Sequence, residues 1–356
     1  FGQSDRERIN MAYRRIGIIG AGNTGLALAA HLVSKGFTPL VMTRHARIVN
    51  MLEEGLKVQG AIQGVLPIHA TTDMHKLVSS CDLLIVSTWA NAHSEILRQI
   101  ARYSDESSCR SIMVLNGNWG AYQVTNFADR LGIHLGIAES AGMPYVSRRN
   151  LSEKDINLSI SGIKDSITVS QESTADSELE SLLALLFHDI QYEDSFFATS
   201  LSAPNPVIHA PLCLLNLARI QEREHFHILV DGFSPEAEDI IQGLDAERAA
   251  IARCLHVGYT PILEQLNGFW NVHHSSLQDF FLKQALYANL EGPRSIRHRF
   301  IQEDVPFGIV PLVDLGRTVG SSTPISKALS ELYRPYLQPY DRIEFSADSL
   351  AAMSKR

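Results

Sequence analysis

Short apolar runs alternate with helix-like segments through the first third of the chain. Four runs have the length and composition of buried strands and occupy residues 16–20, 39–42, 82–87 and 112–116. Segments 26–33, 47–56 and 94–102 lie between them and have the composition and spacing of helices. Strands that alternate with helices form a parallel sheet, because each helix carries the chain back to the start of the next strand. The pattern therefore predicts a doubly wound α/β domain.

The pattern changes after residue 137. Segments 156–161 and 166–170 alternate apolar with polar residues around a Gly-Ile-Lys turn, which predicts a hairpin that extends the sheet in the antiparallel sense. From about residue 200 to residue 290 most runs are helical, and the clearest covers 236–255. We expect a first domain over 11–195 and a mostly α-helical domain over 196–356.

Length and composition agree with a two-domain protein of the reduced cytoplasm. The 356 residues exceed what one core usually organises, and the formal charge of −8 argues against binding to a nucleic-acid backbone. No apolar run approaches the roughly 18 residues that cross a bilayer. Residues 1–10 are polar and charged, unlike a secretory signal, and we leave them out of the fold. The four cysteines lie far apart without a CxxC pair, so we expect neither disulfides nor a metal.

A glycine-rich turn follows the first strand and opens the first helix. Its residues are Gly20, Ala21, Gly22, Asn23, Thr24 and Gly25, a GxGxxG motif in the context that dinucleotide binding requires. One glycine makes the tight turn, one lets the diphosphate approach the backbone, and one lets helix and strand pack closely. The helix N-terminus then favours the anion. The motif predicts a Rossmann domain that binds a nicotinamide dinucleotide.

The end of the second strand bears on the choice between NAD and NADP. An NAD site usually has an acidic residue there, whereas this chain has Thr43 and Arg44. Threonine can donate to a 2′-phosphate and arginine can pair with it, so we expect NADP(H) to be preferred, with NAD(H) possible. Thr88 follows another strand of the same sheet, and we expect its loop to line the cofactor.

Reduction of C=O or C=N requires a proton donor, and a histidine suits neutral pH. His209 lies between two prolines at the start of the helical region, which would hold its segment in place. A carboxylate would orient the imidazole, and Glu303 and Asp304 are both candidates for that role. From these residues alone, a structural role for His209 remains the commoner alternative.

Several segments, in order, resemble the opine dehydrogenase family (octopine, nopaline and related N-(carboxyalkyl)amino acid dehydrogenases). They are the glycine turn, ESAGMPY at 139–145 with Arg148, NPVIHAP around His209, DAERAAIA at 245–252 and HRFIQEDVPFGIVPL at 298–312. The resemblance extends from Arg15 to about Tyr333. It implies that His209 and Asp304 form an acid–base dyad. It also implies a reductive condensation of an α-keto acid with the amine of an amino acid.

That chemistry needs cationic groups for two substrate carboxylates, and bidentate arginine suits them. Arg148 and Arg299 are the candidates. Asn205 could position the histidine or a carboxylate, and Glu139 could lie near the nicotinamide or help to close the site. Each arginine has an alternative role as a structural ion-pair partner. Trp119 occupies a position where we expect a smaller turn residue, which affects the predicted shape of the cofactor pocket.

Three further alternatives stay open. The amine could be an elaborated amino acid, as in opine metallophores. A ketopantoate-reductase-like enzyme would share the two-domain plan, but that class uses a lysine early in the second domain and none occurs between Lys164 and Lys283. A non-catalytic NADP(H) sensor would need no proton donor. We expect a homodimer without a metal, and we interpret the charges of 245–252 as structural and the histidines at 225, 227, 273 and 274 as unrelated to a metal site.

Overall fold

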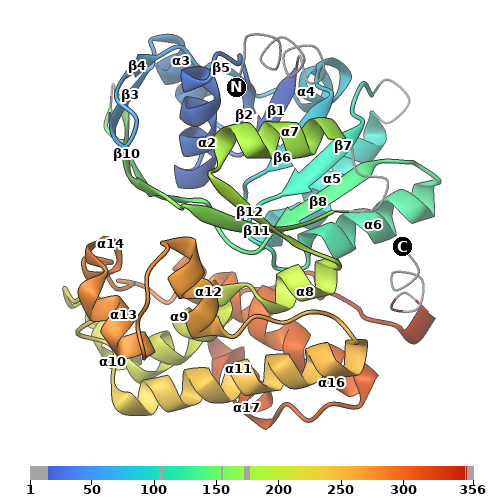
Figure 1. Ribbon diagram of the computed structural model, residues 1–356. Helices are drawn as coiled ribbons and strands as arrows, with labels where there is room; N and C mark the ends of the chain where they lie inside the picture. The colour runs from blue at the N-terminus through green and yellow to red at the C-terminus, as the bar shows by residue number, and fades with distance from the viewer. Residues whose placement is uncertain (1–14, 104–106, 154, 172–176, 349, 351–356) are drawn as a thin grey trace. The chain divides into compact units, whose positions relative to one another are not determined.

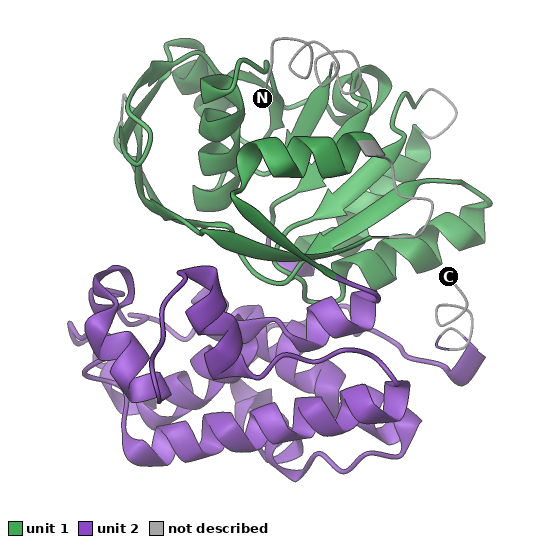
Figure 2. Cartoon of the chain, viewed as in Figure 1, with its two compact units in different colours: residues 1–88, 92–192 green, residues 89–91, 193–356 purple. Residues whose placement is uncertain are grey.

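The computed structural model describes residues 15–103, 107–153, 155–171, 177–348 and 350 (Figure 1). The chain forms two compact units (Figure 2). Unit 1 contains residues up to 88 together with 92–192, and unit 2 contains 89–91 together with the chain from 193 onward. The chain thus leaves unit 1 after Thr88, contributes three residues to unit 2 and returns at Ala92.

Unit 1 is built on an eight-stranded sheet in the order β12-β11-β8-β7-β6-β1-β2-β5. Neighbours from β5 through β8 are parallel, and β11 is antiparallel to β8. This confirms the predicted doubly wound sheet. The strands are β1 (Ile16–Ile19), β2 (Leu40–Met42), β5 (His69–Thr71), β6 (Leu83–Val86), β7 (Ser111–Val114), β8 (Gly136–Ser140), β11 (Ser166–Gln171) and β12 (Asp189–Glu193).

The helices of unit 1 connect these strands and bury the sheet. Residues of α2 and α7 share one core cluster with β6 and β7, so the two helices pack on the sheet through the same apolar layer (Figure 1). The helices are α2 (Asn23–Ser34), α3 (Ala46–Glu53), α4 (Met74–Ser80), α5 (His93–Arg102), α6 (Gly120–Leu131) and α7 (Ser177–Leu186). A 3-10 turn, Ala90–Ala92, begins in the segment that belongs to unit 2 and ends where the chain returns to unit 1.

A second, four-stranded sheet corrects the predicted hairpin. Its order is β4-β3-β10-β9, with β3 (Leu56–Gly60), β4 (Gly64–Leu66), β9 (Tyr145–Leu151) and β10 (Ile156–Ile163). Strand β10 pairs with β9 and β3, while β11 joins the main sheet instead. The apolar side chains of β10 are buried in the core against α2 and α3. An alternating pattern shows that a strand has one buried face but does not show which partner buries it.

Unit 2 is α-helical, as predicted. The expected helix at 236–255 is confirmed as α11 (Pro235–Leu255), which Ser234 caps by accepting from the Ala237 N–H at 3.3 Å. Glu247 of α11 accepts from the backbone N–H of Ile325 at 2.6 Å and from the Ser326 hydroxyl at 2.6 Å, at the start of α17. The charged segment 245–252 therefore contributes to the scaffold.

Several of the remaining helices of unit 2 pack against α11. The remaining helices are α8 (Phe196–Leu201), α9 (Pro204–Leu215), α10 (Leu217–Gln221), α12 (Ile262–Phe269), α13 (Leu277–Lys283), α14 (Ala285–Ala288), α15 (Arg299–Gln302), α16 (Val310–Val319) and α17 (Pro324–Tyr333). A π-helical turn, Val305–Ile309, joins α15 to α16, and a 3-10 turn, Arg334–Tyr336, follows α17. Within the described residues, no helix combines the length and apolarity that a membrane span needs.

Candidate cofactor site and acid–base dyad

The glycine turn between β1 and α2 has the geometry that the motif predicts. Gly20 has a φ of +117° and donates its N–H to the Met42 carbonyl at 3.0 Å. A Cβ on Gly25 would overlap the Gly20 carbonyl and lie 2.5 Å from the Ser87 hydroxyl, whereas a Cβ on Gly22 would meet nothing within 4 Å. Gly25 is therefore required for close packing, and the space beside Gly22 is open to a ligand.

The first turn of α2 fits the diphosphate of a dinucleotide. Gly22 is the N-cap and provides no side-chain cap, and the first turn contains no acidic residue. The first intrahelical bond runs from the Leu26 N–H to the Gly22 carbonyl at 3.1 Å, so the preceding N–H groups lie at the open helix end. Donors at the positive end of a helix favour an anion. When bound, a nicotinamide dinucleotide supplies a hydride.

Thr43 and Arg44 follow β2 and differ in their exposure. Thr43 is buried, with its hydroxyl accepting from the His45 N–H at 3.4 Å, and Arg44 is exposed. Of the other predicted cofactor residues, Thr24 donates its hydroxyl to the Met143 sulfur at 3.2 Å and Asn23 accepts from the Arg149 N–H at 2.9 Å. The Thr88 hydroxyl is buried without a hydrogen-bond partner in the part of the chain that the structure describes.

The segment after β7 has an unusual backbone conformation, which the sequence analysis did not predict. Asn116, Gly117, Asn118 and Trp119 all have positive φ, from 57° to 82°. Trp119 is 2% exposed, so its ring fills the interior at the start of α6. The Asn118 amide is buried and, among the described residues, has no hydrogen-bond partner. Strained residues cluster at functional sites, and the Asn-Gly-Asn sequence at a strand end was the available signal.

In unit 2, His209 and Asp304 form a buried pair. The His209 Nδ1 lies 2.7 Å from an Asp304 carboxylate oxygen, and the ring stacks on Phe300 with centroids 3.6 Å apart. His209 is in α9, and Asp304 lies between α15 and the π-helical turn. A Cβ on Gly308 of that turn would overlap the Pro206 ring, so this glycine allows the two segments to approach. Burial lowers the pKa of His209, and the bond to Asp304 opposes that shift.

Arg299, which is partly buried, and the buried Glu303 form a second pair beside the first. The Arg299 Nε lies 3.1 Å from a Glu303 carboxylate oxygen, and the other oxygen accepts from the Ala90 N–H at 3.0 Å. Glu303 is 1% exposed, and burial raises the pKa of its carboxyl to about 7. Of the two carboxylates that the sequence offered to His209, Asp304 is the partner, and Glu303 holds Arg299 and the 89–91 segment.

The other predicted substrate residues lie in both units. Asn205 is partly buried in the first turn of α9 in unit 2. In unit 1, Arg148 is exposed on β9, and Glu139 on β8 is fully buried and accepts from the Ala121 N–H at 2.7 Å. Glu139 thereby places a negative charge at the N-terminus of α6.

In the other histidine clusters of unit 2, His227 and His274 each pair with one carboxylate. His227 lies 3.4 Å from Asp231, and His274 lies 2.9 Å from Asp279. Within the described residues, no three His, Cys, Asp or Glu side chains are grouped to hold a metal ion.

Comparison with known proteins relates both units to characterised families. The model of the NAD/NADP octopine/nopaline dehydrogenase alpha-helical domain matches residues 192–337, and that of ketopantoate reductase PanE/ApbA matches 16–139. The chain is 26% identical to opine dehydrogenase of Arthrobacter sp. (strain 1C) and 22% identical to Protein ocs of Agrobacterium tumefaciens (strain Ach5), with 88% of each chain covered in both cases. Its helical unit thus matches the octopine/nopaline dehydrogenase domain, and the chain is similar to opine dehydrogenases over most of its length.

Solved structures show the same fold. Apo yersinopine dehydrogenase matches with a TM-score of 0.75 over 96% of this chain and 97% of that one, at 15% identity. Octopine dehydrogenase in complex with NADH and agmatine matches with a TM-score of 0.73 over 90% and 89%, also at 15% identity. Members of the opine dehydrogenase family are NAD(P)-dependent oxidoreductases acting on CH–NH donors.

The glycine turn generates a test that separates packing from ligand approach. We expect Gly25→Ala to lower the free energy of unfolding by about 1–3 kcal/mol, because the new methyl group has no space. Gly22→Ala is the matched control for stability and should unfold like the wild type, but it should bind NADPH more weakly because its methyl group occupies the ligand's space. Thermal denaturation and fluorescence titration with NADPH measure the two effects. Equal unfolding temperatures for the two variants would contradict this assignment.

Glu303 generates a prediction for pH-dependent stability. Its pKa is raised from 4.5 to about 7 in the folded state, so the folded protein keeps a proton that the unfolded chain releases. The stabilisation that the protonated Glu303 carboxyl gives to the folded state is fully present below pH 4.5 and is lost as the pH rises through 7. Glu303→Gln cannot ionise, so its unfolding temperature relative to the wild type should increase between pH 5 and pH 8. Glu331→Gln, which alters an exposed Arg334 pair, is the control and should show a constant difference.

Proposed function

We propose that the protein is an opine dehydrogenase that condenses an α-keto acid with the amino group of an amino acid, or of an amine derived from one, and reduces the product with NADPH. The observation that carries the proposal is the buried His209–Asp304 pair beside Arg299, within the unit that matches the octopine/nopaline dehydrogenase domain. The relatives whose names are opine dehydrogenase and D-nopaline dehydrogenase support the same reaction class.

The reaction proceeds through an imine. The amine nitrogen attacks the keto carbon, and loss of water gives the C=N bond. A hydride adds to the imine carbon and a proton to the nitrogen, which yields a secondary amine with two carboxylates. One molecule of NADPH is oxidised to NADP⁺ for each secondary amine formed. The steps that fall to the protein are proton transfer and the orientation of both carboxylates.

His209 is the proposed proton carrier. Its Nδ1 is engaged by Asp304, which fixes the tautomer and leaves Nε2 as the atom for proton transfer. Because burial lowers the pKa of His209, the free imidazole is neutral at pH 7 and can accept a proton from the substrate ammonium. The Asp304 carboxylate then stabilises the imidazolium, which can return its proton in a later step.

Arg299 is the proposed ligand for a substrate carboxylate. Its Nη2 and the second oxygen of Asp304 are buried and have no hydrogen-bond partner among the described residues. Unsatisfied buried donors are costly, and a bidentate carboxylate would satisfy the guanidinium. Arg148, Asn205 and Glu139 remain predicted contributors to the substrate site. The panel of amines described below tests which amine is the substrate, including an elaborated amino acid of the kind found in opine metallophores.

The preference for NADPH is proposed from the residues after β2. No carboxylate lies between Thr43 and Arg47, and Arg44 is exposed and therefore accessible to a 2′-phosphate. Solved relatives include yersinopine dehydrogenase with NADP⁺ and octopine dehydrogenase with NADH, so the fold accommodates either cofactor. The proposed location is the cytoplasm, where the four free cysteines would stay reduced, and a homodimer remains a prediction.

A keto-acid reductase is the second candidate, because unit 1 matches the ketopantoate reductase model. That match covers the cofactor unit only, whereas the dyad lies in the unit that matches octopine/nopaline dehydrogenases. The two candidates differ in whether turnover needs an amine.

We expect NADPH oxidation, followed at 340 nm, to require both a keto acid and an amine. Pyruvate and 2-oxoglutarate are tested with and without a panel of amino acids, and each reaction is repeated with NADH. Turnover with keto acid alone at the same rate would exclude the opine reaction and favour the keto-acid reductase.

His209→Ala should lower kcat by about 10²–10⁴-fold, because a general acid–base group is lost, without changing the affinity for NADPH. The matched control is His274→Ala, which removes another histidine paired with a carboxylate, His274 to Asp279 at 2.9 Å, in the same unit. The control should retain kcat. A His209→Ala variant with wild-type kcat would exclude His209 as the proton carrier.

A further inference from the structure

The second sheet of unit 1 reaches the glycine turn through β9. The Arg149 Nη1 donates to the Ala21 carbonyl at 2.6 Å, and the Arg149 N–H donates to the Asn23 side-chain oxygen at 2.9 Å. The Ser147 hydroxyl donates to the Asn23 carbonyl at 3.1 Å. Strand β9 is therefore attached to the turn on both sides of Gly22, the position beside which the space is open.

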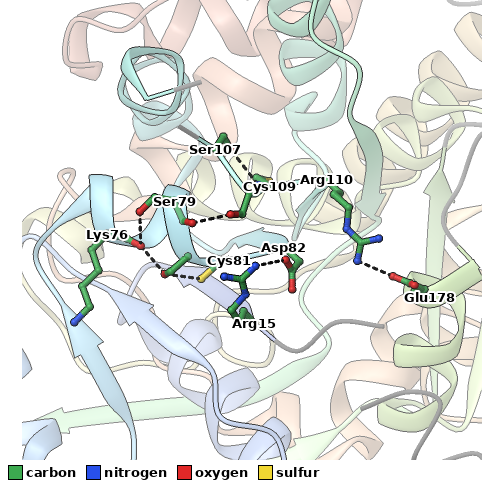
Figure 3. Close-up of polar contacts among 11 residues, drawn as sticks. Arg15, Lys76, Ser79, Cys81, Asp82, Ser107, Cys109, Arg110 and Glu178 are labelled. Atoms are coloured by element: carbon green, nitrogen blue, oxygen red, sulfur yellow. Dashed lines mark hydrogen bonds and ion pairs between the residues drawn. The ribbon is translucent and has the colours of Figure 1, made fainter. Parts of the chain in front are cut away.

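Among the described residues, Arg149 differs from other arginines of unit 1 in having no carboxylate partner. Arg15 pairs with Asp82 at 2.8 Å and Arg110 pairs with Glu178 at 3.0 Å (Figure 3). Arg149 is half-buried, and its side chain contacts a carbonyl oxygen but no carboxylate among the residues that the structure describes. Half-burial removes part of the hydration that compensates an exposed arginine, so an anionic partner would stabilise it.

The position of Arg149 makes its uncompensated positive charge more unfavourable. Ala21 precedes the N-terminus of α2, where the helix dipole is positive and the first turn contains no acidic residue. A cation at the N-terminus of a helix is unfavourable, and an anion bound there would interact favourably with both the helix and the guanidinium. In GxGxxG sites the group that approaches this backbone is the diphosphate.

We propose that Arg149 binds the diphosphate of the dinucleotide and that the β4-β3-β10-β9 sheet holds it at the glycine turn. The bond from Nη1 to Ala21 fixes the guanidinium, and its remaining N–H groups are the donors for phosphate oxygens. Arg149 then contributes equally to NADH and NADPH, whereas Arg44 responds to the 2′-phosphate of NADPH alone. The small sheet thereby acquires a role in cofactor binding.

The test is the affinity of the full chain for NADH and NADPH, measured by fluorescence titration without substrate. We expect Arg149→Met to raise the Kd for both dinucleotides by about 10- to 100-fold, the range for a lost charge-assisted hydrogen bond. Arg149→Lys keeps the charge but loses the planar geometry, and it should raise the Kd to an intermediate extent. Arg15→Met makes the same charge change in unit 1 at a residue paired with Asp82, and it should leave both Kd values unchanged.

Each other outcome has a defined meaning. Wild-type affinity in Arg149→Met would overturn the proposal and leave Arg149 as a structural residue. A loss confined to NADPH would also overturn it, because the contact would then be with the 2′-phosphate. If Arg149→Met unfolds at a lower temperature than the wild type, the Arg149→Lys variant decides, provided that it unfolds at the wild-type temperature. An unchanged Kd in Arg149→Lys then overturns the proposal, and a raised Kd supports it. Because no keto acid or amine is present, these results do not depend on the proposed reaction.

Discussion

Burial of the Asp304 carboxylate is the constraint on which the packing of unit 2 around His209 depends. A charged group removed from water is strongly destabilising unless it is paired, and Asp304 is fully buried. His209 provides the partner 2.7 Å away, so α9 and the segment that follows α15 must come together. Gly308 makes that approach possible because any side chain there would overlap Pro206. The proposed acid–base pair therefore also holds these two segments of unit 2 together.

The neighbouring carboxylate obeys the same constraint with different partners. Glu303 and Asp304 are adjacent and both are buried, so their charges repel unless each is compensated separately. Asp304 is directed to His209, while Glu303 is directed to Arg299 and to the Ala90 N–H. Ala90 belongs to the three-residue segment that follows β6 and Thr88 of unit 1. Glu303 and Asp304 thus hold the proposed proton carrier, the proposed carboxylate ligand and a loop that follows the sheet of unit 1.

Sequence reasoning succeeded where the physical requirement is local. The glycine turn could be interpreted position by position, because a tight turn, an open approach and a close helix–strand contact each require glycine at a fixed place. The strands β1, β2, β6 and β7 of the main sheet were also predicted, since buried strands are continuously apolar, whereas β5, β8 and β12 were not. The partnership of His209 with Asp304 spans 95 residues and came from the family resemblance, because no local pattern connects such distant positions.

Failures arose where the outcome depends on register or on the choice of partner. Strand β10 has a clear alternation, yet that pattern is the same whichever sheet it joins, and the predicted hairpin was wrong. Arg148 and Arg149 illustrate the same limit on β9, where adjacent side chains point to opposite faces. The sequence analysis named Arg148, which is exposed and stays a predicted substrate residue, but it did not identify Arg149, which contacts the glycine turn. A shift of one residue reverses the face, and the sequence around these arginines does not determine it.

The whole chain carries a net negative charge, although the proposed ligands are also anionic. The protein has a formal charge of −8, while a dinucleotide, a keto acid and an amino acid all present anionic groups. The net charge is screened within about 8 Å at physiological ionic strength, so binding depends on cations that are local and oriented. Two arginines for which we propose ligands are held differently: Arg299 by the Glu303 carboxylate, and Arg149 by a carbonyl oxygen. The ion pair with Glu303 partly offsets the charge of Arg299, whereas the charge of Arg149 is left for the two phosphates of the proposed cofactor.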